Sequence, residues 1–101
     1  MYYVICYDIE NDRLRDRTAK VLIRNGCLRI QKSVFVAPEM AKKHLNRLET
    51  GLKHLYARYP LQGRDSVCIF PLTNESTTDV ATFGLNNVVT LLQPIGLKII
   101  L

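Results

Sequence analysis

The first strand that the sequence predicts is apolar on both of its faces. Its alternating side chains are Tyr2, Val4 and Cys6 on one side, and Tyr3, Ile5 and Tyr7 on the other, with Asp8 at the end. Residues 66–72, SVCIFPL, repeat this pattern. Strands of this kind are covered on both faces in folded proteins. A chain of 101 residues forms one domain with one modest core, which covers one face and leaves the second in need of a partner.

Helical and strand periodicities define the other elements. Helices are expected at residues 13–25 and 39–59, and strands at residues 2–8, 28–36, 66–72 and 78–85, with short apolar strands at 88–92 and 97–101. Asn11 or Asp12 offers an N-cap for the first helix, and Gly26 fits its C′ position. The second helix carries an apolar stripe at helical spacing from Ala41 to Tyr59. We expect an α+β fold, the ferredoxin-like βαββαβ sandwich with an extra C-terminal strand.

The expected sheet carries both helices on one face and leaves its second face bare. Because that face is apolar, we expect a homodimer in which two sheets stack about a two-fold axis. Residues 1–85 are expected to form the ferredoxin-like domain. We expect residues 86–101 to form a C-terminal strand or tail that packs on the sheet or on the partner subunit.

Charge is distributed unevenly along the chain. Residues 1–64 contain 13 Lys and Arg against 6 Asp and Glu, whereas residues 65–101 contain 1 against 3. The basic front half indicates a surface for a polyanion such as nucleic acid, and the apolar rear half indicates packing.

Targeting and cysteine patterns indicate the compartment. The N-terminus lacks a basic region, and no apolar run approaches about 18 residues, so neither a signal peptide nor a membrane span is expected. Cys6, Cys27 and Cys68 are odd in number and form no C-x-x-C pair, which argues against a disulfide framework or a zinc knuckle. Cysteines within apolar strands are expected to be buried thiols. We therefore expect a cytoplasmic protein without a membrane partner.

Asp8 is the first candidate functional residue, because it ends an otherwise apolar strand. A carboxylate in this position serves as a metal ligand or a base, or it caps the following loop. One carboxylate alone holds Mg²⁺ poorly, since the ion takes several oxygen ligands in octahedral geometry. A two-fold axis near this strand would bring Asp8 of each chain to one ion. Glu10, Asp12 and Asp16 fit capping or solvated positions better.

Four bases line one side of the first predicted helix. At about 100° per residue they fall within roughly 60° of one another: Arg13, Arg17, Lys20 and Arg24. The alternatives are an ordinary solvated face and a track for phosphates, and the alignment favours the track. Arg15 projects instead into the apolar arc, from which it is able to turn back toward Asp8.

The segment 28–36 mixes polar and apolar side chains in an unusual way. One alternation set contains a cation, an amide, a hydroxyl and an aromatic: Arg29, Gln31, Ser33 and Phe35. Such a row suits contact with a phosphate or base, or a hydrogen-bonded dimer seam. Lys32 interrupts the apolar set. His44 and His54 lack ligand spacing and are expected at the surface.

Together these motifs resemble the CRISPR-associated protein two family. The resemblance rests on Tyr7-Asp8-Ile9 after the first strand, on Arg15 and Arg17, on residues 26–35 (GCLRIQKSVF) and on residues 65–72 (DSVCIFPL). It covers residues 1–85. The resemblance implies a ferredoxin-like homodimer that works in spacer acquisition beside the CRISPR integrase.

The family's site residues carry over by their place in these motifs. The strand-one aspartate binds a divalent metal at the dimer interface, which corresponds to Asp8. The other catalytic positions implied by the resemblance are Tyr7, Arg15, Arg17, Arg29, Ser33 and Phe35. Lys32 stands where an aromatic is frequent and adds charge there.

Two functions from different classes follow. The first is a metal-dependent endonuclease for RNA or DNA, in which Asp8 of both subunits holds Mg²⁺. The second is a non-catalytic DNA-binding scaffold subunit of the integrase complex. Under both hypotheses the expected nucleic-acid contacts are Arg13, Arg17, Lys20, Arg24 and Lys32. A single-strand RNA-binding module is a third, weaker alternative, because no RNP-type aromatic motif is present.

Overall fold

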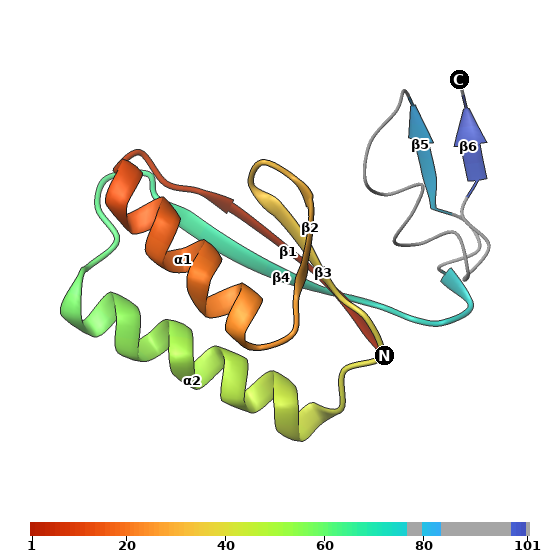
Figure 1. The fold of residues 1–101 in the computed structure, drawn as a ribbon, viewed down its shortest axis with the longest axis horizontal. Coiled ribbons are helices and arrows are strands. Elements are labelled where there is room, and N and C mark those ends of the chain that lie inside the picture. The colour runs from red at the N-terminus through yellow and green to blue at the C-terminus, as the bar shows by residue number, and fades with distance from the viewer. Residues whose placement is uncertain (77–79, 84–97, 101) are drawn as a thin grey trace.

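A computed structural model describes residues 1–76, 80–83 and 98–100 of the chain (Figure 1). The strands are β1 (Tyr2–Asp8), β2 (Leu28–Gln31), β3 (Val34–Ala37), β4 (Ser66–Leu72), β5 (Ala81–Phe83) and β6 (Lys98–Ile100), and the helices are α1 (Asp12–Arg24) and α2 (Lys42–Arg58). The main sheet has the order β2-β3-β1-β4, and all of its neighbouring strands are antiparallel. This arrangement of four strands and two helices is the predicted ferredoxin-like α+β fold.

The segment predicted as one strand at residues 28–36 is a hairpin. Its two strands, β2 and β3, are joined by a turn at Lys32 and Ser33. The single-strand prediction was wrong because this turn contains no Gly, Asn or Pro to mark it. Because residues 28–36 supply two strands instead of one, β4 is the fourth strand and completes the sheet. Within the strand predicted at 78–85, the described residues Ala81–Phe83 form β5, which pairs in parallel with β6 in a separate sheet.

The two helices begin and end close to their predicted bounds. The Asn11 side chain caps α1 by accepting a hydrogen bond from the Leu14 amide at 2.9 Å. Gly26 follows the helix with φ +85°, a conformation that favours glycine and ends the helix. α2 begins at Lys42, later than predicted, because the chain turns at Pro38 and at Glu39, which has φ 41°.

Both helices cover the same face of the sheet, which Figure 1 shows in side view. Between the layers lies a core whose largest fully buried apolar side chains are Ile5, Leu22, Phe35 and Leu48. The apolar stripe predicted in α2 faces this core through Leu48 and Leu52. The Thr18 hydroxyl lies 2.8 Å from the Tyr56 hydroxyl and joins α1 to α2 within the same layer. Burial raises the pKa of Tyr56.

The second face of the sheet carries no helix. We call it the open face, and by strand register it includes Val4, Cys6, Asp8, Val34, Ser66, Cys68 and Phe70. Tyr2 and Val36 are buried at one end of it against Val80. Phe70 is 53% exposed and Leu28 is 39% exposed. In a single chain the open face is therefore apolar and accessible, as the strand pattern predicts.

Some predictions concern residues outside the described part of the chain. The strand predicted at residues 88–92 lies outside it, and the division into residues 1–85 and 86–101 stays a prediction. Among the described residues, neither helix has the length and apolar character that crossing a membrane requires.

Candidate metal ligand and nucleic-acid interface

Asp8 lies at the end of β1, opposite Ser66 of β4, and its side chain is exposed on the open face. Its carboxylate takes part in none of the hydrogen bonds or ion pairs of the described residues. Residues 1–76, 80–83 and 98–100 contain no cluster of three or more His, Cys, Asp or Glu side chains able to hold a metal ion. One chain therefore offers a metal a single unengaged carboxylate here.

Tyr7 points to the helix-covered side of the sheet. Its side chain is buried, and its ring stacks on that of Phe35 with the centroids 6.1 Å apart. The Tyr7 hydroxyl donates a hydrogen bond to the backbone carbonyl of Lys32 at 3.4 Å. The Tyr7 amide donates to the carbonyl of Ser33 at 3.1 Å. Tyr7 thereby holds the turn between β2 and β3 against β1.

Arg29 and Phe35 face each other across the hairpin as register partners. The Arg29 guanidinium lies over the Phe35 ring, 4.9 Å from its centroid, and its Nη2 donates to the Tyr7 hydroxyl at 3.5 Å. The predicted row of four side chains along one strand is therefore wrong, because Ser33 lies in the turn. Phe35 is fully buried and has no surface to offer to a nucleic acid in this structure.

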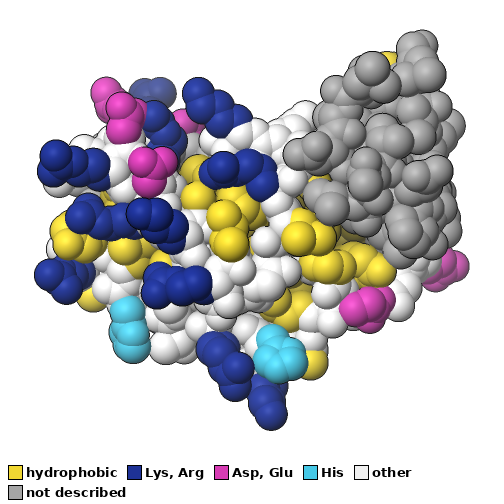
Figure 2. Space-filling view, viewed as in Figure 1, with side chains coloured by type: hydrophobic (Ala, Val, Ile, Leu, Met, Phe, Trp, Pro, Cys, Tyr) yellow, Lys and Arg dark blue, Asp and Glu magenta, His cyan; other side chains and the backbone are white. Residues whose placement is uncertain are grey.

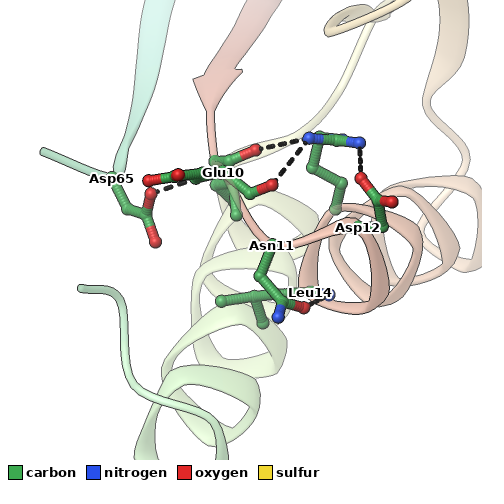
Figure 3. A network of polar contacts seen from close by, with 7 residues as sticks. Glu10, Asn11, Asp12, Leu14 and Asp65 are labelled. Atoms are coloured by element: carbon green, nitrogen blue, oxygen red, sulfur yellow. Dashed lines mark hydrogen bonds and ion pairs between the residues drawn. The ribbon is translucent and has the colours of Figure 1, made fainter. Parts of the chain in front are cut away.

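Arg15 turns back toward the end of β1, as its place in the helix predicts. Its Nη1 donates to the backbone carbonyls of Ile9 and Glu10 at 3.0 and 2.9 Å, and its Nη2 pairs with Asp12. Figure 3 shows these contacts around the connection between β1 and α1. The guanidinium of Arg15 is thus engaged in holding the loop that follows Asp8.

Asp65 holds the same loop from the other side, which the sequence did not indicate. Its Oδ1 accepts a hydrogen bond from the Glu10 amide at 3.0 Å (Figure 3). Its Oδ2 accepts one from the Gln62 amide at 3.1 Å. Asp65 therefore ties the loop that follows β1 to the loop that precedes β4, next to Asp8.

The basic ridge of α1 borders a groove between the two helices. Arg13, Lys20 and Arg24 are exposed, as predicted, while Arg17 lies over the Tyr59 ring at 3.9 Å from its centroid. The groove has a volume of about 340 Å³, and its basic lining residues are Arg17, Lys20, Arg24, His54 and Arg58. Figure 2 shows Lys and Arg side chains gathered over the helices.

The sequence did not predict the part of this groove that α2 contributes. His54 was expected at the surface without a function, Tyr59 was expected in the apolar stripe of the second helix, and Arg58 was not singled out. Only the packing of α2 beside α1 brings them to the ridge. Lys32, the fifth predicted nucleic-acid contact, lies in the β2–β3 turn and is exposed.

The three cysteines differ in their surroundings. Cys27 is buried, and burial raises its pKa to about 11. Cys6 and Cys68 are register partners on the open face, where Cys6 is partly buried and Cys68 is exposed. The expectation of buried thiols within the strands was therefore wrong for Cys68, because its strand has one uncovered face. Burial, and secondarily the neighbouring Cys68, raise the pKa of Cys6.

Comparisons with known proteins agree on one family. The model of the family described as CRISPR associated protein Cas2 matches residues 1–80. A protein of Aeropyrum pernix named CRISPR-associated endoribonuclease Cas2 is 30% identical, over 83% of this chain and 86% of its own length. A Synechocystis protein named CRISPR-associated endoribonuclease Cas2 3 is 35% identical, over 81% of this chain and 83% of its own.

A solved structure shows the same fold. It is the crystal structure of a hypothetical protein TT1823 from Thermus thermophilus, with a TM-score of 0.56 and 32% sequence identity. The likeness covers 71% of this chain and 80% of that one. The ferredoxin-like sheet, the match over residues 1–80 and the relatives in two organisms together show that this chain belongs to the CRISPR-associated protein Cas2 family.

Proposed function

We propose that the chain is a metal-dependent endonuclease of CRISPR spacer acquisition, which cleaves phosphodiester bonds of RNA or DNA as a cytoplasmic homodimer. In this proposal Asp8 of both subunits holds Mg²⁺. The observation that carries it is the exposed, unengaged Asp8 carboxylate at the end of an apolar, uncovered sheet face. The names of the relatives in Aeropyrum and Synechocystis, both endoribonucleases, support the reaction class.

Asp8 has the chemistry that a hydrated Mg²⁺ requires. The ion is commonly held through one or two carboxylates while it keeps several waters. A second copy of the chain would supply the second carboxylate, and no rearrangement within one chain is needed to free the first. When bound, Mg²⁺ supplies charge stabilisation at the phosphate and lowers the pKa of a coordinated water.

The open face supports the proposed homodimer. It includes Phe70 and Leu28, both large, apolar and exposed in the single chain. Exposed apolar faces of this kind mark interaction surfaces, and a two-fold interface uses the same face of both copies. Because Asp8 lies on that face, stacking two copies would bring two such carboxylates toward the axis.

The basic residues would have different roles in the site. Arg17, with the exposed members of the α1 ridge, would bind backbone phosphates. Arg29 is exposed beside Tyr7 and would offset charge on a phosphate near the β2–β3 turn, where Ser33 offers a hydroxyl. Arg15 already bonds two backbone carbonyls, so it is a positioning residue for the loop after Asp8.

The proposal is tested by replacing Asp8 with Asn in the purified full-length chain. The matched control is Asp16→Asn, an exposed α1 carboxylate whose loss changes the net charge by the same amount. We expect Mg²⁺-dependent cleavage of RNA or DNA by wild type and by Asp16→Asn, and background cleavage by Asp8→Asn. The proposal fails if wild type cleaves neither substrate across a full metal and pH series, or if Asp8→Asn cleaves as fast.

A second candidate is the DNA-binding scaffold subunit that bridges copies of the integrase. The groove between α1 and α2 favours it, because cations from both helices border one continuous surface. Duplex binding through such cations releases counterions, so affinity falls with salt by a slope set by the number of phosphate contacts.

The scaffold is tested with the double variant Lys20→Ala, Arg24→Ala. Its control is Lys42→Ala, Lys43→Ala, which removes the same charge from the exposed start of α2. We expect the salt slope of duplex binding to lose about 0.9 for each phosphate contact removed by the α1 double variant, and to be unchanged in the control. Equal slopes for both variants would remove the groove from the interface.

A further inference from the structure

The Tyr59 ring, at the end of α2, lies beside two guanidinium groups that come from different helices. The guanidinium carbon of Arg17, on α1, is 3.9 Å from the ring centroid, and that of Arg58, on α2, is 5.5 Å from it. Tyr59 is half-buried against the core, and its amide donates to the Leu55 carbonyl at 2.8 Å. The ring is therefore a fixed support for both cations. We call Arg17, Arg58 and Tyr59 the Tyr59 clamp.

The two guanidiniums of the clamp have no polar partner within the described part of the chain. Neither of them takes part in a hydrogen bond or an ion pair there. Asp65 lines the same surface, but its two carboxylate oxygens accept hydrogen bonds from the Glu10 and Gln62 amides. Two like charges are thus held beside one ring, and an anion bound to both would offset their repulsion.

The clamp lies where two hollows of the helix layer meet. One is the groove between α1 and α2, and the other, of about 380 Å³, extends to Asn11 and Gln62. All three clamp residues line both hollows. A strand of nucleic acid that occupies both hollows therefore passes the clamp.

We propose that the Tyr59 clamp is a binding site for a phosphate group, in which Arg17 and Arg58 donate to the phosphate oxygens and Tyr59 positions both side chains. The planar guanidinium presents its N–H donors as a fork that matches the oxygens of a phosphate. Contact with an aromatic ring restrains a guanidinium and leaves N–H donors for an anion. This restraint also lowers the conformational entropy that binding costs.

The inference rests on the proposed function for the source of the phosphate, which is the backbone of a bound nucleic acid. A terminal phosphate or a free phosphate has the same chemistry. The clamp belongs to the helix layer, whereas Asp8 lies on the open face, so the clamp would hold a phosphate other than the one at the proposed metal. Arg58 is then a binding residue and Tyr59 a positioning residue, roles that the family resemblance assigns to neither.

The first test titrates the full-length protein with inorganic phosphate and follows the arginine Nε–Hε signals by NMR, against a chloride titration of equal ionic strength. We expect the Arg17 and Arg58 signals to shift together along one saturation curve. Arg58→Met should weaken phosphate binding at Arg17 about tenfold, because charge-assisted hydrogen bonds are lost. The control Arg47→Met, at an exposed position of α2 outside the clamp, should leave it unchanged. Clamp signals that stay in place, or that move equally with chloride, would overturn the proposal.

The positioning role of Tyr59 is tested with two variants. Tyr59→Phe keeps the ring and should keep the phosphate affinity of wild type, whereas Tyr59→Leu removes the ring and should weaken binding. Because Tyr59→Leu also changes core packing, urea unfolding of each variant establishes conditions under which both are folded. Wild-type affinity in folded Tyr59→Leu would overturn the assignment of Tyr59.

The second test identifies the source of the phosphate through the salt dependence of duplex binding. We expect Arg58→Met to lower the salt slope by about 0.9 and Arg47→Met to leave it unchanged. If phosphate moves the clamp signals while Arg58→Met keeps the wild-type slope, the clamp stands and takes a terminal or free phosphate. If wild type binds no duplex, the scaffold function fails, and the phosphate titration still decides the clamp.

Discussion

Tyr7 and Asp8 are adjacent in the sequence, yet they point to opposite faces of β1. Tyr7 is buried on the helix-covered side, while Asp8 is exposed on the open face. The family resemblance assigns both to catalysis, and the structure separates their surroundings completely. Asp8 is accessible to a metal ion, and Tyr7 is engaged with the β2–β3 turn.

Tyr7→Phe should therefore affect stability more than cleavage. The variant keeps the ring that stacks on Phe35 and loses only the hydroxyl, whose two contacts are long, at 3.4 and 3.5 Å. We expect the free energy of unfolding in urea to fall by about 0.5–1 kcal/mol. Nuclease activity should stay near that of wild type. A folded Tyr7→Phe protein that has lost cleavage as fully as Asp8→Asn would place the hydroxyl on the substrate.

Arg15→Met should loosen the loop that follows Asp8. Methionine keeps much of the apolar stem and removes the guanidinium, which bonds the carbonyls of Ile9 and Glu10. We expect a loss of about 1–2 kcal/mol in the free energy of unfolding. Arg13→Met is the matched control, because Arg13 is exposed and lies two residues earlier in α1. This variant should lose less than about 0.5 kcal/mol in the free energy of unfolding. Similar losses in both variants would show that the carbonyl contacts contribute little.

Cys27 should make the protein less stable in alkali. Its pKa is about 11 in the folded chain, above the ordinary value of 9.0 at which it ionises when unfolded. The stabilisation is complete below pH 9 and is lost as the pH rises from 9.0 to about 11. We expect wild type to lose about 1–3 kcal/mol more than Cys27→Ala across this window, measured by urea unfolding. Parallel losses in the two proteins would contradict this assignment.

Phe70→Glu should prevent the proposed stacking of two sheets. Phe70 is 53% exposed on the open face, and a carboxylate there would be buried without a partner in a stacked dimer. Sedimentation is expected to show a dimer for wild type and a monomer for Phe70→Glu. Ile23→Glu is the control, because Ile23 is 55% exposed but lies on α1. A dimer that survives Phe70→Glu must use another surface.

Much of the fold follows from local patterns in the sequence. The Asn11 cap, Gly26 and the apolar stripe of α2 act over one or two helical turns, so both helices are predictable. The β2–β3 hairpin is not predictable from local patterns. Its strands are continuous in β-propensity through Lys32 and Ser33, and the chain reverses there because β3 pairs with β1 as well as with β2.

The candidate site is likewise predictable only where it depends on local patterns. Alternation along residues 2–8 already places Asp8 with Cys6 and apart from Tyr7. The partners of these residues depend on pairing between distant segments: Asp65 reaches Glu10, Arg58 and His54 reach the α1 ridge, and Cys68 reaches Cys6. No local pattern encodes such registers, because they are decided by how the helices and strands pack together.

The central place of β1 has a consequence for synthesis of the chain. In the order β2-β3-β1-β4, the first strand made has one neighbour in β3 and the other in β4. The ribosome must therefore release residues through Leu72 before β1 is hydrogen-bonded along both edges. A nascent chain ending after α2 has an unpaired edge on its middle strand, which is a risk for association with other chains. The four-stranded sheet is therefore complete only after β4 has been made.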